Sequence, residues 1–357
     1  MIMDLLVRHF IHLMERGYLP DCVIRMGIRM LLRNRILELN SHIDKKLYFE
    51  KYINSLKTSP LAIMTNKANE QHYEVPTEFY DLCLGLHKKY SSCYWGDEQV
   101  NLEHAEQYSL DLSIEHADIH DGMSVLELGC GWGSLSLELA KRFPNSKITS
   151  VSNSKTQKLY IDQKATERGL TNLEVLTLDL GKEESYSRFQ LNHFDRVMSI
   201  EMMEHLRNYD LFFELVSHCM KADAKFFIHV FTHKSTPYYF ESHGDDNWMG
   251  KYFFSGGQMP SVDLFENFDR NLVVRNKWIW NGRHYQKTLE AWLSKMDLNK
   301  TRIQDLFVNA YGSQNARLWF NRWRVFYMSC SELFGYSNGN EWHVTHYLLT
   351  KKDFNEK

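Results

Sequence analysis

The stretch that most constrains the fold is Ser124 to Leu135, with the sequence SVLELGCGWGSL. Apolar residues surround Glu127, glycines alternate at Gly129, Gly131 and Gly133, and the helical pattern SLSLELAKRF follows. This order predicts a buried strand, a tight turn and a helix. Because glycines lack a Cβ atom, a ligand could lie against this backbone, near the free N–H groups of the next helix. Glu127 adds a carboxylate at the strand end, where it could meet a cationic ligand.

The composition bounds the class of protein. The 357 residues are 43% hydrophobic and 24% charged, which suits a globular chain with a sizeable core. A net charge of −3, without a basic and aromatic array, argues against nucleic acid as a partner. The six cysteines show no zinc-finger spacing, and charges interrupt the N-terminal apolar run before it could form a secretory signal. We therefore expect a cytoplasmic protein. The sequence leaves open whether it is a monomer or a homodimer.

Residues 1–100 are expected to form a helical region that covers the active site. Helical periodicity runs through residues 1–60, and four arginines gather on the face that the apolar residues leave: Arg25, Arg29, Arg33 and Arg35. A basic amphipathic helix could contact an anionic membrane surface, although packing on its own domain is the commoner role. His116 and His120, at the end of a following helix, lack a third ligand, so we interpret them as a solvated helix end and expect no metal.

Residues 101–357 are expected to form the core. Strands alternate with helices from residue 124 to residue 233, a pattern typical of an α/β protein with a parallel, doubly wound sheet. Ligands of such sheets bind at the carboxyl ends of the strands. The segment at about 236–270 is rich in glycine, aspartate and aromatic residues and is predicted to be a substrate lid. A helical insertion is predicted at about 285–336.

Polar residues follow the second and third strands. The second strand ends at Ser152 and Asn153, with Gln157 one helical turn later, where nucleotide enzymes usually have an acid for the ribose hydroxyls. Amides donate and accept hydrogen bonds, so they can still bind a diol. Asp179, after the third strand, is placed to accept from an adenine amino group, and a helix cap is its alternative role.

The fourth strand closes with the sequence IEMMEH. It places Glu201, Glu204 and His205 within five residues, beside the expected cofactor pocket. Two carboxylates and an imidazole in such a place favour a general base. Capping of the next helix is the alternative role for Glu204 and His205.

Several motifs together resemble one family: GCGWGSLSL, VSNSKTQ, IEMMEHLRNY, GDDNWMGKYFFSGGQMPS and GRHYQKTLEAW. They are similar to the plant coclaurine N-methyltransferases, within the superfamily of cyclopropane fatty acid synthases and mycolic acid methyltransferases. The resemblance runs from about residue 60 to the end. It implies a class I, Rossmann-like methyltransferase fold with a mostly parallel seven-stranded sheet, and S-adenosylmethionine as cofactor. It places the cofactor against these residues: Ser91, Gly129, Asn153, Gln157, Asp179, Leu180 and, near the methyl group, Ile200.

The two branches of this superfamily differ in their base. The resemblance implies that the lipid enzymes hold a bicarbonate base with a Cys, a Glu, a His and a Tyr. This chain keeps Glu204 and His229 but has Ser92 and Phe326 at the other two positions, and Cys93 could restore the site through a shifted register. We therefore expect N-methylation of a small amine, aromatic or alkaloid-like. C-methylation or cyclopropanation of unsaturated acyl chains is one alternative, and a cofactor-binding protein without catalysis is another.

An N-methyltransferase needs a proton acceptor and a pocket for a cation. The resemblance implies that Glu204 with His205 accepts the proton, with Glu201 as a second carboxylate near the amine. Aromatic walls would favour a cationic guest, and four are expected from their position: Tyr80, Tyr238, Phe254 and Tyr285. Cys330 is expected to be a buried structural thiol.

Overall fold

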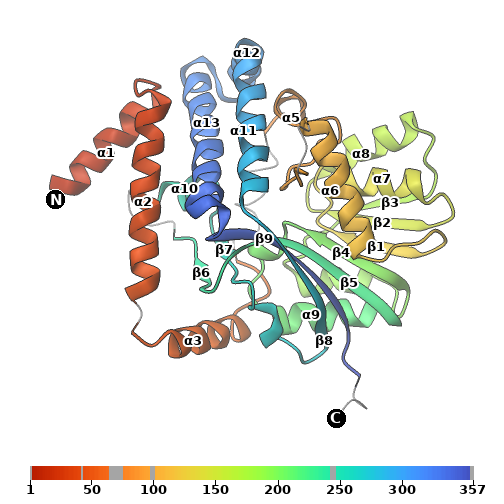
Figure 1. Ribbon diagram of the computed structural model, residues 1–357. Coiled ribbons are helices and arrows are strands. Elements are labelled where there is room, and N and C mark those ends of the chain that lie inside the picture. The colour runs from red at the N-terminus through yellow and green to blue at the C-terminus, as the bar shows by residue number, and fades with distance from the viewer. Residues whose placement is uncertain (1, 42, 64–74, 97–100, 242–246, 354–357) are drawn as a thin grey trace.

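The structure is a computed structural model that describes residues 2–41, 43–63, 75–96, 101–241 and 247–353, with side chains from residue 7 onward. A seven-stranded sheet lies at its centre, with helices on both faces (Figure 1). The strands follow the order β3–β2–β1–β4–β5–β9–β8. Their bounds are β1 Ser124–Leu128, β2 Lys147–Ser152, β3 Leu173–Thr177, β4 Phe194–Ile200, β5 Met220–His233, β8 Leu272–Trp280 and β9 Trp342–Lys351.

The pairing of the strands confirms the predicted sheet. Strands β1 to β5 pair in parallel, and β9 is antiparallel to both of its neighbours, β5 and β8. The sheet is therefore mostly parallel, as in class I methyltransferases. Because the parallel strands end at the same edge, the residues that follow β1, β2, β3 and β4 meet there.

Two layers of helices cover the sheet. Apolar side chains of α6 and α7 pack on one face, and those of α3 and α9 pack on the other. The helix α8 lies beside α7 and β3. The bounds are α3 Lys45–Lys57, α5 Thr77–Cys83, α6 Leu102–His116, α7 Ser134–Arg142, α8 Lys155–Glu167 and α9 Tyr209–Cys219.

A helical group stands above the carboxyl edge of the sheet. Its members are α1 Ile2–Glu15, α2 Asp21–Ser41, α11 Arg283–Leu298, α12 Lys300–Tyr311 and α13 Ser313–Gly335. Figure 1 shows α2 running beside α13, although some 290 residues separate them.

Ion pairs attach α2 to this group and correct one expectation. Arg25 lies 2.7 Å from Glu290 and 3.0 Å from Glu332, and Arg29 lies 2.5 Å from Glu332. Arg35 pairs with Glu38 at 2.7 Å. Arg25 and Arg29 are therefore engaged with α11 and α13 and do not form a free basic face.

The segment predicted as a lid contains short elements: β6 Tyr238–Tyr239, α10 Trp248–Tyr252 and β7 Gln258–Met259. Residues 242–246 of this prediction lie outside the described residues. Within the described ranges, no helix has both the length and the apolar character needed to cross a membrane. The same residues contain no group of three or more His, Cys, Asp or Glu side chains placed to hold a metal ion.

Candidate active site

A pocket lies on the glycine turn between β1 and α7. Gly129 has φ +84° and Gly131 has φ +52°, a backbone region that favours glycine. A Cβ atom on Gly129 would lie 2.9 Å from Cγ of Met202, whereas one on Gly131 would meet nothing within 4 Å. The turn therefore requires glycine and leaves room for a ligand against its backbone.

Five of the seven predicted cofactor residues line this pocket: Gly129, Asn153, Gln157, Asp179 and Leu180. Ser91 does not line it, because its side chain is buried and its hydroxyl accepts a hydrogen bond from Lys89 Nζ at 2.6 Å. Ile200 does not line it either and packs with the cluster between the sheet and the helices α6 and α7.

The polar atoms of the pocket fit a nucleoside. Gln157 is 1% exposed, and its Oε1 accepts from the Ser152 hydroxyl at 2.6 Å. Its Nε2 has no partner among the described residues. A buried donor without a partner destabilises a protein unless a ligand satisfies it, and a ribose hydroxyl would do so. Asp179 accepts from the backbone N–H of Gly181 at 3.0 Å, which keeps its carboxylate at the pocket wall.

Glu127 does not reach this pocket, contrary to the expectation from its position. Its carboxyl group accepts hydrogen bonds from the hydroxyls of Ser136 and Ser150, between the sheet and α7. Burial raises the pKa of Glu127 to about 7. The reason is strand alternation: the side chains of Leu126 and Leu128 point to the opposite face, so Glu127 must point toward α7.

A second cavity of about 360 Å³ adjoins the edge of the sheet. Three of the four predicted aromatic residues line it, namely Tyr238, Phe254 and Tyr285. Tyr80 does not, because it is fully buried between Tyr90 and Trp132. His205 lines both this cavity and the glycine-turn pocket, so the two spaces meet at its side chain.

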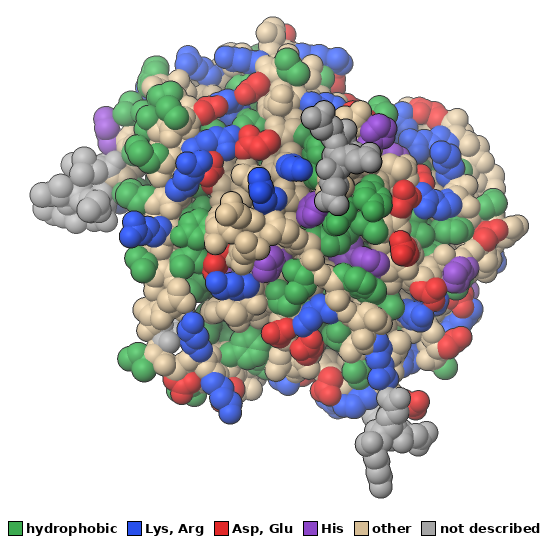
Figure 2. All heavy atoms as spheres, in the orientation of Figure 1, with side chains coloured by type: hydrophobic (Ala, Val, Ile, Leu, Met, Phe, Trp, Pro, Cys, Tyr) green, Lys and Arg blue, Asp and Glu red, His purple; other side chains and the backbone are tan. Residues whose placement is uncertain are grey.

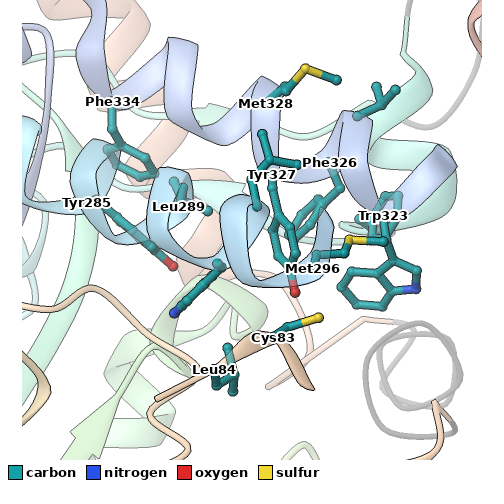
Figure 3. Packing of buried hydrophobic residues seen from close by; sticks show 14 of the residues in the cluster. Cys83, Leu84, Tyr285, Leu289, Met296, Trp323, Phe326, Tyr327, Met328 and Phe334 are labelled. Atoms are coloured by element: carbon teal, nitrogen blue, oxygen red, sulfur yellow. The ribbon is translucent and has the colours of Figure 1, made fainter. Parts of the chain in front are cut away.

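The helical group forms most of the cavity wall. Figure 3 shows Tyr285 and Leu289 of α11 facing Phe326 and Phe334 of α13. From α2, Leu31 and Arg35 line the same cavity, which the sequence analysis missed. The apolar periodicity of residues 21–41 predicted a packed helix but carried no signal for a cavity wall.

Glu201 is held in one position by its neighbours. Its φ of +46° is uncommon for a residue with a side chain, and such strain is often found at functional sites. The Ser92 backbone N–H donates to Oε1 at 2.9 Å, and the Tyr285 hydroxyl donates to Oε2 at 2.6 Å. His229 Nε2 lies 3.2 Å from Oε1. The carboxyl group therefore faces the cavity in a fixed orientation.

Glu204 is the second carboxyl group of the cavity. It is 2% exposed, and its Oε2 has no hydrogen-bond partner among the residues that the structure describes. Burial, together with the charge of Glu201, raises its pKa well above the ordinary value. A carboxyl group with a raised pKa and an unused oxygen can accept a proton from a bound ligand.

The four positions of the lipid-enzyme base do not converge on this cavity. Glu204 and Phe326 line it, but His229 and Ser92 are fully buried behind Glu201. Cys93 is also fully buried, with its thiol directed at the Ser91 carbonyl, so the shifted register does not restore the site.

Cys330, expected to be a buried structural thiol, is half-buried and lines the cavity. Burial raises the pKa of its thiol, which keeps it protonated and unreactive.

The glycine turn, the pocket whose polar atoms fit a nucleoside, and the sheet order define a class I methyltransferase, whose cofactor is S-adenosylmethionine. The family model for mycolic acid cyclopropane synthetase matches residues 62–344. The chain belongs to this family and, by its relatives, to the branch of the coclaurine N-methyltransferases.

Three comparisons support this assignment. The (S)-coclaurine N-methyltransferase of Thalictrum flavum subsp. glaucum is 34% identical over 345 residues, or 95% of this chain and 94% of that protein. The enzyme of the same name from Papaver somniferum is 35% identical over 344 residues, or 95% and 97% of the two chains. A solved structure of coclaurine N-methyltransferase bound to N-methylheliamine and SAH has a TM-score of 0.92 at 33% identity, covering 97% of this chain and 100% of that one. The predicted family, cofactor and N-methyltransferase activity are confirmed.

The Gln157 amide provides a test of the cofactor pocket. Gln157→Met removes the unpartnered donor at nearly constant volume, so we expect the Kd of S-adenosylhomocysteine to rise roughly 5- to 20-fold. Titration calorimetry measures this change, and the KM for the methyl acceptor should stay constant. An unchanged Kd would remove Gln157 from the cofactor site.

Proposed function

We propose that the protein transfers a methyl group to the nitrogen of an aromatic, alkaloid-like amine. The observation that carries this proposal is the placement of two carboxyl groups, the largely enclosed Glu201 and the buried Glu204, in an aromatic cavity that meets the cofactor pocket at His205. The names of the coclaurine N-methyltransferase relatives support the same class of acceptor.

The cavity residues handle the charge and the proton of the amine. An aliphatic amine with a pKa near that of lysine, about 10.4, arrives largely as a cation. Glu201 pairs with this cation, and Glu204 accepts its proton, which frees the nitrogen lone pair. S-adenosylmethionine supplies the electrophilic methyl group when bound. The aromatic walls at Tyr238, Phe254 and Tyr285 exclude water and hold the acceptor in line with the methyl group.

Transfer to lipid acyl chains is the competing function, and the geometry disfavours it. A bicarbonate held by the Ser92 and His229 positions would lie behind Glu201, outside the cavity. Both ring nitrogens of His229 are also engaged, by Glu201 and by His346 at 2.7 Å.

A methyl-transfer assay with labelled S-adenosylmethionine separates these functions. We would test secondary and tertiary aromatic amines in parallel with unsaturated phospholipid vesicles, each with and without bicarbonate. Label on an amine, indifferent to bicarbonate, supports the proposal. Label in the lipid would overturn it in favour of acyl-chain chemistry, and cofactor binding without any turnover would favour the non-catalytic alternative.

The cellular location, the oligomeric state and any membrane contact of the protein are still predictions. We expect a cytoplasmic protein that is a monomer or a homodimer. We also expect that its N-terminal helices can contact an anionic membrane. In support of such contact, α2 exposes Met26, Met30 and Leu37, each more than 60% accessible, and Figure 2 shows hydrophobic and basic side chains side by side over α1 and α2. Co-sedimentation with anionic vesicles and sedimentation velocity would test these expectations.

A further inference from the structure

Three histidines from distant parts of the chain lie together behind Glu201. His229 in β5 is paired with His346 in β9, and His346 is paired in turn with Trp278 in β8. Directly paired residues of antiparallel strands point to the same face of a sheet. Since β5, β9 and β8 are neighbours (Figure 1), these three side chains form a row across the sheet.

His116, at the end of α6, completes the group. Its ring stacks on that of Trp278, with centroids 4.0 Å apart and an interplanar angle of 6°. His116 is half-buried, so its interpretation as a solvated helix end is wrong. The sequence could not show this, because Trp278 lies more than 160 residues further along the chain.

Hydrogen bonds join the three rings to Glu201 in a continuous chain. His116 Nδ1 lies 2.8 Å from His346 Nδ1, and His346 Nε2 lies 2.7 Å from His229 Nδ1. His229 Nε2 then reaches Glu201 Oε1 at 3.2 Å. His229 and His346 are fully buried, while His116 at the outer end is partly accessible.

The chemistry of the rings fixes the direction of these bonds. Burial lowers the pKa of His229 to about 4 and also lowers the pKa values of His346 and His116, so all three are neutral near pH 7. A neutral imidazole has one donor and one acceptor nitrogen. Glu201 as a carboxylate only accepts, so His229 must donate from Nε2 and accept at Nδ1. His346 must then donate from Nε2 and accept at Nδ1, which requires His116 to donate from Nδ1.

We propose that His116, His346 and His229 are positioning residues, whose one-way chain of hydrogen bonds keeps the Glu201 carboxylate directed at the amine. This inference rests on the proposed function, in which Glu201 pairs with the cationic acceptor. Hydrogen bonds in such a chain polarise one another, so the outermost donor strengthens the innermost bond. Two fully buried imidazoles and a half-buried third would be a poor choice for packing alone, where apolar side chains serve better.

Other groups around the chain are compatible with this direction. Trp280 packs against His346 with ring centroids 4.1 Å apart and against His229 at 5.4 Å. The buried ammonium of Lys89 donates to Ser91 and to the Ser92 carbonyl, and its positive charge further favours neutral His229 and His346.

A pair of variants at the outer end tests the proposal without altering the cavity. Asn and Leu have nearly the same shape, and both remove the ring stack on Trp278, but only Asn can donate to His346 Nδ1. We expect His116→Leu to raise the KM for the amine roughly three- to tenfold, and His116→Asn to stay within about twofold of the wild type. The kcat and the Kd of S-adenosylhomocysteine should change little in either variant. His120→Leu, on a neighbouring exposed residue, is the control.

The position of the protons gives a second readout that does not depend on turnover. Nitrogen-15 NMR of the full-length protein should show His116 protonated at Nδ1, and His346 and His229 protonated at Nε2. In His116→Leu, His346 and His229 should no longer be protonated exclusively at Nε2. In His116→Asn, both should still be protonated at Nε2. The opposite tautomers, or equal KM values for the Asn and Leu variants, would overturn the chain. If the tautomers agree but no amine is methylated, the chain stands and the proposed function fails.

Discussion

Glu204→Gln is expected to lower the kcat for amine methylation by roughly 10²- to 10⁴-fold, the usual effect of removing a general base. The substitution keeps the size of the side chain and its place in the cavity but removes its ability to accept a proton. The Kd of S-adenosylhomocysteine should not change, because Glu204 lines the acceptor cavity and not the glycine-turn pocket. Steady-state kinetics and calorimetry on the same preparations would measure both quantities.

The pH dependence identifies Glu204 more sharply. Burial and the neighbouring Glu201 raise the pKa of Glu204. The group therefore stays protonated, and cannot act as a base, up to pH values well above those at which an ordinary glutamate ionises. In the wild type, kcat/KM should therefore fall on the acid side at a pH above that range. This fall of kcat/KM on the acid side should disappear in Glu204→Gln. A variant that keeps either the wild-type turnover or the acid-side fall would show that another group accepts the proton.

The stability of the same variant separates lost chemistry from lost folding. A carboxyl group whose pKa is higher in the folded state contributes stability below its unfolded pKa, and this contribution is lost as the pH rises through the folded value. At neutral pH, glutamine avoids this loss, so the Tm of Glu204→Gln should equal or exceed that of the wild type. A lower Tm would indicate a structural role for the carboxyl group.

Glu201→Gln is expected to act mainly on binding. The substitution removes the negative charge that pairs with the protonated amine in a buried cavity, so the KM for the amine should rise roughly 10- to 100-fold. Because Glu204 remains as the proton acceptor, kcat should fall less than in Glu204→Gln. Measurement of kcat and KM over a range of amine concentrations distinguishes the two carboxyl groups.

Glu241→Gln is a matched comparison for this charge. Glu241 lies at the same cavity but is exposed, so water screens its interaction with a cation. Its removal should change the KM less than threefold. Equal effects of Glu201→Gln and Glu241→Gln would indicate a general electrostatic attraction, and not a specific pairing with Glu201.

Much of the site could be predicted because it depends on local pattern and on one rule of parallel sheets. Gly129, Asn153, Gln157 and Asp179 each follow a strand, and parallel strands bring their carboxyl ends together. The IEMMEH sequence after β4 had to meet them at the same edge. The side-chain directions were less certain, as Glu127 shows.

The sequence by itself determined the class of fold, the cofactor turn and the acid pair at the end of β4, since these depend on residues close together in the chain. Only the tertiary structure decided that α2 forms a cavity wall, that His229 lies behind Glu201, and that His116 joins His346. The physical reason is that these contacts join residues of separate helices and strands, which lie 28 positions apart for Glu201 and His229 and 230 for His116 and His346. Their geometry follows from strand register and helix packing, which periodicity along the chain does not encode.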